Sequence, residues 1–223
     1  MFDMGFGTTG AGFADAAGDG LESMYQEVIL DAARNPHGKT HFESTDELAQ
    51  AELQEESQES AGNTKSAEIT LNNAHESCVA AGENSALGQS HQFNPTCGDE
   101  VTMRVELSRS ANNDETPIVS SIKWDGHGCS ISQASLSMMV DLVEGKSVDE
   151  ALRLDALFHK LMESRGEGFE NEEDEDALED AMVLQGVSRY PMRIKCALLA
   201  WEGLKDSIAK ASQNLNPQIL GNL

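Results

Sequence analysis

One long segment of this chain is unsuited to a hydrophobic core, and this limits what the rest of the sequence can form. From about residue 43 to residue 90 the chain carries ten acidic residues, one lysine and no aromatic residue. A segment of this kind buries too little apolar surface to offset the entropy lost when it becomes ordered. We therefore predict an acidic, disordered insertion at about 43–90, with room for one short strand at 68–71. The folded structure must then be built from the sequence on either side.

The flanking sequence predicts an α+β domain. Apolar residues recur every three or four positions from Leu21 to Arg34, which indicates a helix that ends at Asn35-Pro36. Apolar and polar residues alternate at 101–107 and again near 118–124, as is typical of an antiparallel hairpin. Helical patterns follow at 130–143, 148–164, 177–185 and 191–211, with an acidic loop at 166–176. We expect a small antiparallel β-sheet packed by helices, in a single domain over 21–223 that follows a Gly-rich flexible leader at 1–20.

The charge of the chain excludes several kinds of partner. Fifteen basic residues stand against 39 acidic ones, which gives a net charge of −24. Such a chain should repel nucleic acid phosphates and anionic membrane surfaces. No run of about 18 apolar residues is present, and the N-terminus lacks the pattern of a signal peptide. We expect a cytoplasmic protein, in which four cysteines favour metal or redox chemistry over disulfides.

Cys97 lies in a sequence that turns the chain. Pro95 and Gly98 favour a tight turn just before the strand predicted at 101–107. Asp99 follows two residues after the thiol, so a bend can direct both groups at one ion. Asp99 can equally cap the turn through its own side chain.

Cys129 and Cys196 lie at the starts of predicted helices. Cys129 immediately precedes the helix predicted at 130–143, where backbone amides stabilise a thiolate. Cys196 follows Arg193 and Lys195 near the start of the last helix, and nearby cations also favour a thiolate. These settings suggest a metal site, although burial as an inert structural residue is also a common fate of cysteine.

Spacing alone leaves the chemistry open. The three cysteines are far apart, whereas zinc fingers and ribbons use pairs about two to four residues apart. His127 is a candidate ligand or proton carrier beside Cys129, or an exposed turn residue. Cys78 lies in the acidic insertion without a glycine turn or basic neighbour, and we assign it no role. A zinc hydrolase would need an open coordination position and a nearby general base, and no HExxH motif is present.

The cysteines and their flanks together resemble a known family. The chain resembles the SufU proteins, within the wider group of IscU-like and NifU N-terminal iron–sulfur assembly proteins. The stretches that carry the resemblance are LESMYQEVILDAARNPHGK (21–39), NPTCGDEVTMRVEL (94–107), WDGHGCSISQASLSMMVDLVEGKSVDEAL (124–152) and LQGVSRYPMRIKCALLAWEGLKDSI (184–208). Two details favour the SufU branch. Lys195 stands where IscU-like proteins usually have His, and 165–179 resembles the extra SufU loop.

The resemblance implies a site and a function. It implies that Cys97, Asp99, Cys129 and Cys196 gather at one end of an α+β fold and bind zinc. It also implies that the protein is the partner of a SufS-like pyridoxal-phosphate cysteine desulfurase rather than a stand-alone enzyme. Persulfide sulfur would be accepted on Cys97, the ligand we expect to be released from zinc, and passed to a downstream SUF scaffold or to apoproteins. In the alternative, IscU-like role, the same ligands hold iron or a nascent iron–sulfur cluster.

Two basic residues are further candidates for a role at the site, and the chain differs from its relatives at two places. Arg193 and Lys195 are expected to steady the departing thiolate or to meet an acidic patch on the desulfurase. The first helix ends in Ala32-Ala33, where relatives usually show His and an aromatic residue. The stretch between Lys39 and Phe93 is also much longer than in relatives.

Overall fold

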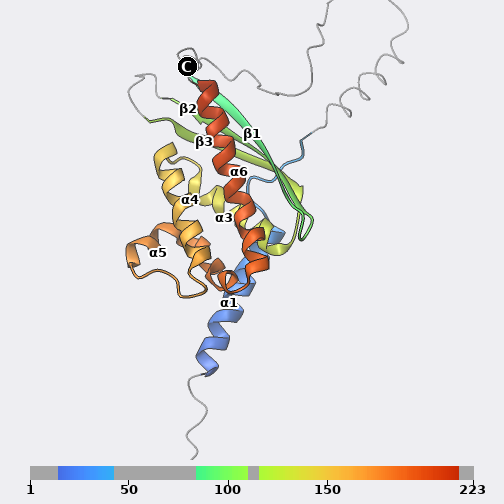
Figure 1. Cartoon of the computed structure of the whole chain (residues 1–223), viewed down its shortest axis with the longest axis vertical. Coiled ribbons are helices and arrows are strands. Elements are labelled where there is room, and N and C mark those ends of the chain that lie inside the picture. The colour runs from blue at the N-terminus through green and yellow to red at the C-terminus, as the bar shows by residue number, and fades with distance from the viewer. Residues whose placement is uncertain (1–14, 43–83, 110–115, 216–223) are drawn as a thin grey trace, which may run out of the picture.

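The computed structural model describes residues 15–42, 84–109 and 116–215. It contains one antiparallel sheet and a set of helices, arranged as an α+β fold (Figure 1). The strands are β1 (Ser85–Asn94), β2 (Asp99–Ser108) and β3 (Ile118–His127). The helices are α1 (Asp15–Arg34), α3 (Ser130–Val143), α4 (Val148–Glu163), α5 (Glu172–Leu178), the 3₁₀ helix η1 (Glu179–Arg189) and α6 (Pro191–Leu215). The predicted fold class is confirmed.

The sheet is a meander in the order β1-β2-β3, and both strand pairs are antiparallel. The hairpin predicted from the alternating residues at 101–107 and 118–124 is confirmed as β2 and β3, with Val105 opposite Ile122. Alternate residues of β2 are fully buried and their neighbours are half-buried, as expected for a strand with one face on the core. The buried set is Val101, Met103, Val105 and Leu107.

Strand β1 corrects the predicted insertion. Residues 85–90 belong to a strand paired along its whole length with β2, so the predicted insertion extends too far toward the C-terminus. The sequence signal is weak because α6 packs against β1 through Gly88, not through a large apolar side chain. A Cβ at Gly88 would lie 2.0 Å from the Ser207 carbonyl oxygen, so only glycine fits at this crossing. The remaining part of the insertion, including the strand predicted at 68–71, lies outside the described residues.

The helices agree with the prediction in position, but several of their bounds differ. Helix α3 has the predicted bounds, α4 ends one residue early, and α6 continues four residues further. Residues 15–20, assigned to a flexible leader, are the first turns of α1, despite a cost of about 1 kcal/mol for each helical glycine. Residues 172–176, the last part of the predicted acidic loop, belong to α5, because Asn171 caps the helix and acids in its first turn favour the N-terminal end. The helix predicted at 177–185 is the end of α5 followed by η1.

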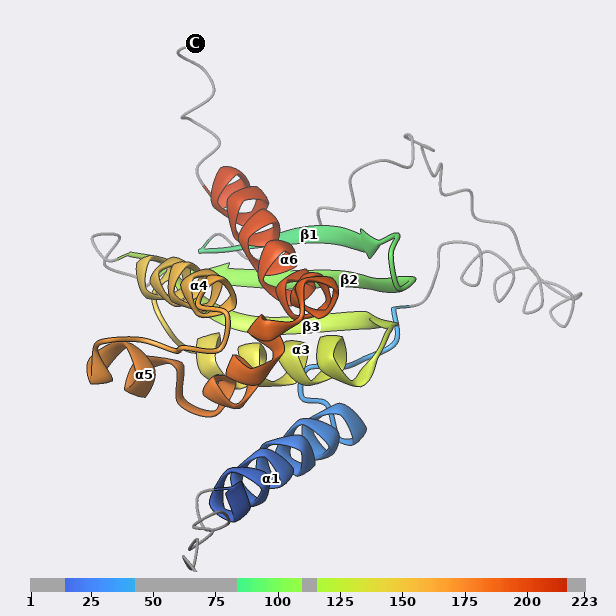
Figure 2. The same cartoon turned by 60° about the horizontal axis from the view of Figure 1, so that its bottom comes forward.

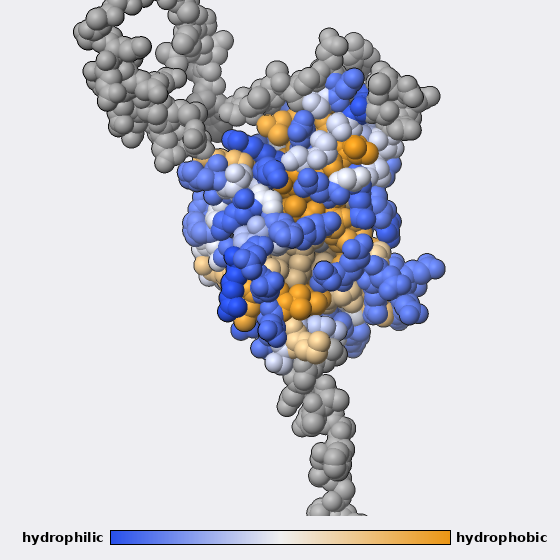
Figure 3. Space-filling view, turned by 180° about the vertical axis from the view of Figure 1, so that it is seen from behind, coloured by the Kyte–Doolittle hydropathy of each residue, from blue (hydrophilic) through white to orange (hydrophobic). Residues whose placement is uncertain are grey.

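The core lies between the sheet and its helices. Figure 2 shows α6 crossing one face of the sheet over β1 and β2, with α3 beside β3 and α1 on the far side of α3. Trp124 is fully buried, and Phe158 stacks on Trp201 with ring centroids 4.6 Å apart. Much of the surface is hydrophilic, with hydrophobic residues exposed between polar ones on the face shown in Figure 3. No helix in the described part of the chain is both long enough and apolar enough to cross a membrane.

Both ends of the segment 43–83 are fixed to the sheet. The Arg104 guanidinium lies over the Phe42 ring, with its central carbon 3.9 Å from the ring centroid. The backbone N–H of Phe42 donates a hydrogen bond to Asp125 Oδ2 at 2.8 Å. At the other end, the Asn84 carbonyl accepts a hydrogen bond of 2.9 Å from the Arg109 N–H. The described residues on either side of 43–83 are therefore anchored to the sheet.

Candidate metal centre

Cys97 occupies the tight turn that joins β1 to β2. The Gly98 N–H donates to the Asn94 carbonyl at 2.8 Å, and the Thr96 N–H donates to Asn94 Oδ1 at 3.0 Å. Gly98 has φ +77°, a conformation that side chains other than glycine rarely adopt. The turn predicted from Pro95 and Gly98 is thus present. It leaves the Cys97 side chain exposed at one end of the sheet.

Asp99 is the first residue of β2 and is almost completely buried. Its Oδ1 accepts a 3.0 Å hydrogen bond from the backbone N–H of Cys129, the residue that precedes α3. Its Oδ2 is also buried and has no hydrogen-bond partner among the described residues. A Cβ at Gly128 would lie 3.0 Å from Asp99 Cγ, so glycine there makes room for the carboxylate. Asp99 therefore ties β2 to the start of α3 and retains one free oxygen.

Cys196 comes from the other side, in the first turns of α6, and is buried. Its Sγ lies 3.3 Å from Cys97 Sγ and accepts a 3.7 Å contact from Asn94 Nδ2. Burial raises the pKa of the Cys196 thiol, and the neighbouring Cys97 and Asp99 side chains raise it further. The expectation that Arg193 and Lys195 would favour a thiolate here is wrong, because both are exposed and burial dominates.

Three of the four predicted ligands meet at one point. Donor atoms of Cys97, Asp99 and Cys196 all lie within 4.8 Å of one another. The thiol of Cys129 is not in this group. Cys129 is exposed and lines, with Cys97, Cys196 and Arg193, a cavity of about 430 Å³ that we call the thiol cavity. The structure thus places the fourth predicted ligand on the wall of the same cavity.

The chemistry of this group suits a metal cation. Burial opposes ionisation of Asp99, but interactions with the Cys97 thiol and the Cys129 amide outweigh it and lower the pKa of the carboxyl group. A buried carboxylate with one unpaired oxygen beside two thiols lacks a positive partner among the described residues. Thiolate sulfur and carboxylate oxygen are ligands of tetrahedral zinc, and thiolates also bind iron. The donor set therefore fits a metal ion without selecting between these two metals.

Comparison with known proteins identifies the family of this chain. Residues 68–197 match the family described as the NifU-like N-terminal domain. The chain belongs to this family. Within this family, the chain is 40% identical over 117 residues to the zinc-dependent sulfurtransferase SufU of Bacillus subtilis. The aligned region covers 52% of this chain and 71% of the Bacillus subtilis protein. The chain is also 40% identical over 127 residues to the iron–sulfur cluster assembly scaffold protein IscU of Streptococcus pyogenes. That alignment covers 56% of this chain and 72% of the Streptococcus pyogenes protein.

The fold of this NifU-like domain is shared with a solved relative. A crystal structure of the N-terminal part of a nitrogen-fixing NifU-like protein from Brucella abortus superposes with a TM-score of 0.52, covering 86% of this chain and 97% of that one. Since the two sequences are only 17% identical, the similarity concerns the fold.

The remaining residues that were considered for the site differ in their position relative to the thiol cavity. Arg193 is exposed at the thiol cavity, with its guanidinium 4.9 Å from the centroid of the Tyr190 ring. Lys195 is exposed and does not line that cavity. His127 is exposed, as expected, but it is the last residue of β3, opposite Glu100 and outside the cavity, and not a turn residue. Sequence reasoning overlooked Asn94, whose backbone and side chain shape the Cys97 turn. An Asn-Pro pair before a cysteine was the available signal.

Proposed function

We propose that this NifU-like chain works in iron–sulfur cluster assembly as a zinc-dependent acceptor of persulfide sulfur. The observation that carries the proposal is the convergence of Cys97, Asp99 and Cys196 within 4.8 Å, with an unpaired buried oxygen on Asp99. The name of the Bacillus subtilis relative, a zinc-dependent sulfurtransferase, supports this chemistry. The donor would be a SufS-like pyridoxal-phosphate cysteine desulfurase, and the sulfur would pass to a downstream SUF scaffold or to apoproteins in the cytoplasm.

Four residues would hold the zinc ion. Cys97, Asp99 and Cys196 supply the converging donors, and Cys129 supplies the fourth from the wall of the thiol cavity. Zinc bound to these donors would keep the thiols deprotonated at neutral pH, including Cys196, whose pKa is otherwise raised by burial. The predicted insertion would then lie between Phe42 and residue 68, where the match to the NifU-like N-terminal domain begins.

Cys97 is the acceptor in this proposal. Its thiolate attacks the terminal sulfur of a persulfide on the donor enzyme, a new S–S bond forms at Cys97, and the donor cysteine leaves as a thiolate. The exchange needs no external oxidant or reductant, because one sulfur–sulfur bond replaces another. Cys196 is buried and cannot meet a donor directly, whereas Cys97 is exposed at the tip of a turn. Cys129 is exposed as well, so exposure alone does not distinguish it from Cys97.

The acceptor assignment can be tested by mass spectrometry. Wild-type chain incubated with a cysteine desulfurase and cysteine should carry a persulfide on the peptide that contains Cys97. The Cys97→Ala variant should lose this label. The Cys129→Ala variant, which lacks the other exposed thiol, should keep the label on Cys97. Equal labelling of wild type and Cys97→Ala would refute the assignment.

A second candidate is a scaffold that assembles an iron–sulfur cluster on the same ligands. The observation in its favour is the 40% identity to a relative named as an iron–sulfur cluster assembly scaffold. Anaerobic reconstitution with iron and sulfide after zinc removal distinguishes the candidates. A stable cluster chromophore that transfers to an apoprotein supports the scaffold, whereas tight zinc and stimulation of the desulfurase support sulfur transfer.

A further inference from the structure

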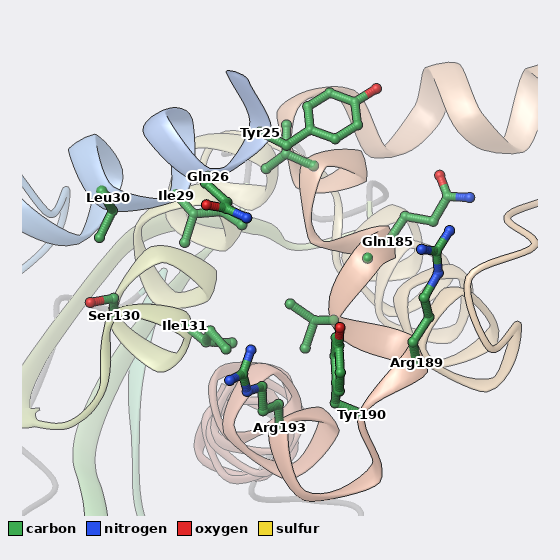
Figure 4. Close-up of a pocket in the computed structure, with 13 residues that line it drawn as sticks. Tyr25, Gln26, Ile29, Leu30, Ser130, Ile131, Gln185, Arg189, Tyr190 and Arg193 are labelled. Carbon is green, nitrogen blue, oxygen red and sulfur yellow. The ribbon is translucent and has the colours of Figure 1, made fainter. Parts of the chain in front are cut away.

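A second cavity lies next to the thiol cavity. It has a volume of about 650 Å³ and is formed by α1, α3, η1 and the first turn of α6. We call it the α1 groove, and its principal residues are Tyr25, Leu30, Ile131, Arg189, Tyr190 and Arg193. Figure 4 shows the α1 side chains on one side and Tyr190, Arg189 and Arg193 on the other, with Ile131 between them.

The apolar surface of the groove continues beyond the cavity. Helix α1 packs against the core through half-buried Ile29, Ala32 and Ala33, so its outer apolar side chains remain exposed. Tyr25 and Leu30 are about two-fifths exposed, and Met192, which lines the neighbouring thiol cavity, is 60% exposed. Contiguous exposed apolar residues with polar neighbours are typical of protein–protein interaction sites. This extent favours a protein segment as the occupant over a small molecule held inside the cavity.

Two arginines give the groove a charge opposite to that of the chain. Although acidic residues outnumber basic ones by 39 to 15, neither Arg189 nor Arg193 has an ion pair with any described residue. Arg189 packs over Gly166, where a Cβ would lie 2.4 Å from its Nε, and Arg193 lies over the Tyr190 ring. Arginine binds carboxylates with two parallel hydrogen bonds, and Arg, Tyr and Met are enriched in protein interfaces.

The groove is continuous with the candidate metal centre. Ser130, Ile131 and Arg193 line both the α1 groove and the thiol cavity. A segment seated in the groove would therefore lie beside the cavity that Cys97 and Cys129 line.

From these observations we infer that the α1 groove docks a segment of the sulfur-donating partner, one that presents an apolar side chain flanked by carboxylates. The inference rests on the proposed function. The apolar side chain enters between α1 and Ile131, and the carboxylates meet Arg189 and Arg193. Docking in this way holds the donor persulfide next to the exposed Cys97 thiol.

The experiment uses the full chain with zinc bound and a purified cysteine desulfurase from the same organism. Leu30→Ala and Arg189→Glu alter the groove without touching the thiol cavity. Matched controls are Leu152→Ala, an exposed leucine on α4, and Lys123→Glu, an exposed cation on β3. Persulfide loading of Cys97 is followed over a range of desulfurase concentrations.

We expect a variant that combines Leu30→Ala with Arg189→Glu to raise the half-saturating desulfurase concentration about tenfold, with most of the rate recovered at saturation. The two controls should saturate near the wild-type concentration. If the groove variants saturate like wild type while wild type accepts persulfide, this inference is wrong and the proposed function stands. If wild type neither binds the desulfurase nor accepts sulfur, both fail. Tighter binding by the groove variants would assign the groove to acidic residues 43–59 of this chain and would overturn partner docking.

Discussion

The Cys97 thiol lies 3.3 Å from the Cys196 thiol, although the two residues are 99 positions apart in the chain. One belongs to an exposed turn of the sheet and the other to a buried turn of α6. Asp99 completes the group and links it to the start of α3 through the Cys129 N–H. The candidate centre therefore depends on the correct packing of α6 and α3 against the end of the sheet.

Replacing Asp99 with Asn should weaken zinc binding by at least tenfold. The amide retains an oxygen for the Cys129 N–H but loses the negative charge and offers a poorer ligand to the metal. Competition with a chromophoric chelator measures the affinity. Asp125→Asn, which alters a carboxylate that binds the Phe42 N–H, serves as the control and should keep wild-type affinity. Equal affinity of the two variants would exclude Asp99 as a ligand.

Oxidation of the zinc-free chain should join Cys97 to Cys196. Their sulfur atoms are already close, and a mild peroxide treatment removes two hydrogens from the pair as the peroxide is reduced to water. Peptide mapping in a Cys78→Ser background should find this disulfide, with Cys129 still open to alkylation. Zinc at saturation should slow the reaction. A disulfide between Cys97 and Cys129 instead would contradict the arrangement of the thiols.

His159 should make the stability of the fold dependent on pH. The Asp155 carboxylate raises the pKa of His159 to about 9 against the opposing effect of burial, with a further contribution from Glu202 at 3.1 Å. Because the folded pKa lies above the unfolded value, this stabilisation is fully present below about pH 6.5 and is lost as the pH rises through about 9.

The variant His159→Gln tests this dependence. Urea unfolding at pH 6 should show a loss of about 1–2 kcal/mol relative to wild type, after allowance for solvent screening, and little loss at pH 9.5. His127→Gln, at the exposed end of β3, should follow the wild-type curve. A loss of equal size at both pH values would mean that His159 stabilises the fold by packing, not by charge.

Gly88→Ala should destabilise the fold by about 2 kcal/mol or more, because the added methyl group would overlap the α6 backbone at Ser207. Gly186→Ala is the matched control, since no atom lies within 4 Å of a Cβ at that position. Urea unfolding measures both variants. Comparable stability of the two would show that α6 can move away from β1 at little cost.

The sequence was informative where periodicity and turn residues reflect local physics. Strands β2 and β3, helix α3 and the Cys97 turn follow from alternation, helical spacing and the Pro95–Gly98 pair. Strand β1 was largely missed, because Gly88 contributes to packing by having no side chain. No local pattern could reveal that Cys97 meets Cys196, since that contact depends on how α6 crosses the sheet. The family resemblance supplied this expectation, and the geometry brings three of the four residues together.

The sequence also misleads about the pKa of the Cys196 thiol in the absence of metal, for a related reason. Sequence proximity to Arg193 and Lys195 suggested a stabilised thiolate, but helix geometry leaves both cations exposed while the thiol faces the interior. The cost of desolvation then exceeds the attraction of nearby positive charges. Burial depends on tertiary packing, so it cannot be inferred from the residues that are adjacent in the sequence.

The anchoring of Phe42 and Asn84 has a consequence for how this chain can vary in length. Since both flanks are held by β2 and its neighbours, the interval between them can grow or shrink without disturbing the register of the sheet. Chain statistics put the cost of doubling such an interval at only about 0.6 kcal/mol. A fluorescent reporter or an affinity handle inserted next to Asn84 would lie at the end of β1 opposite the Cys97 turn, away from the thiols.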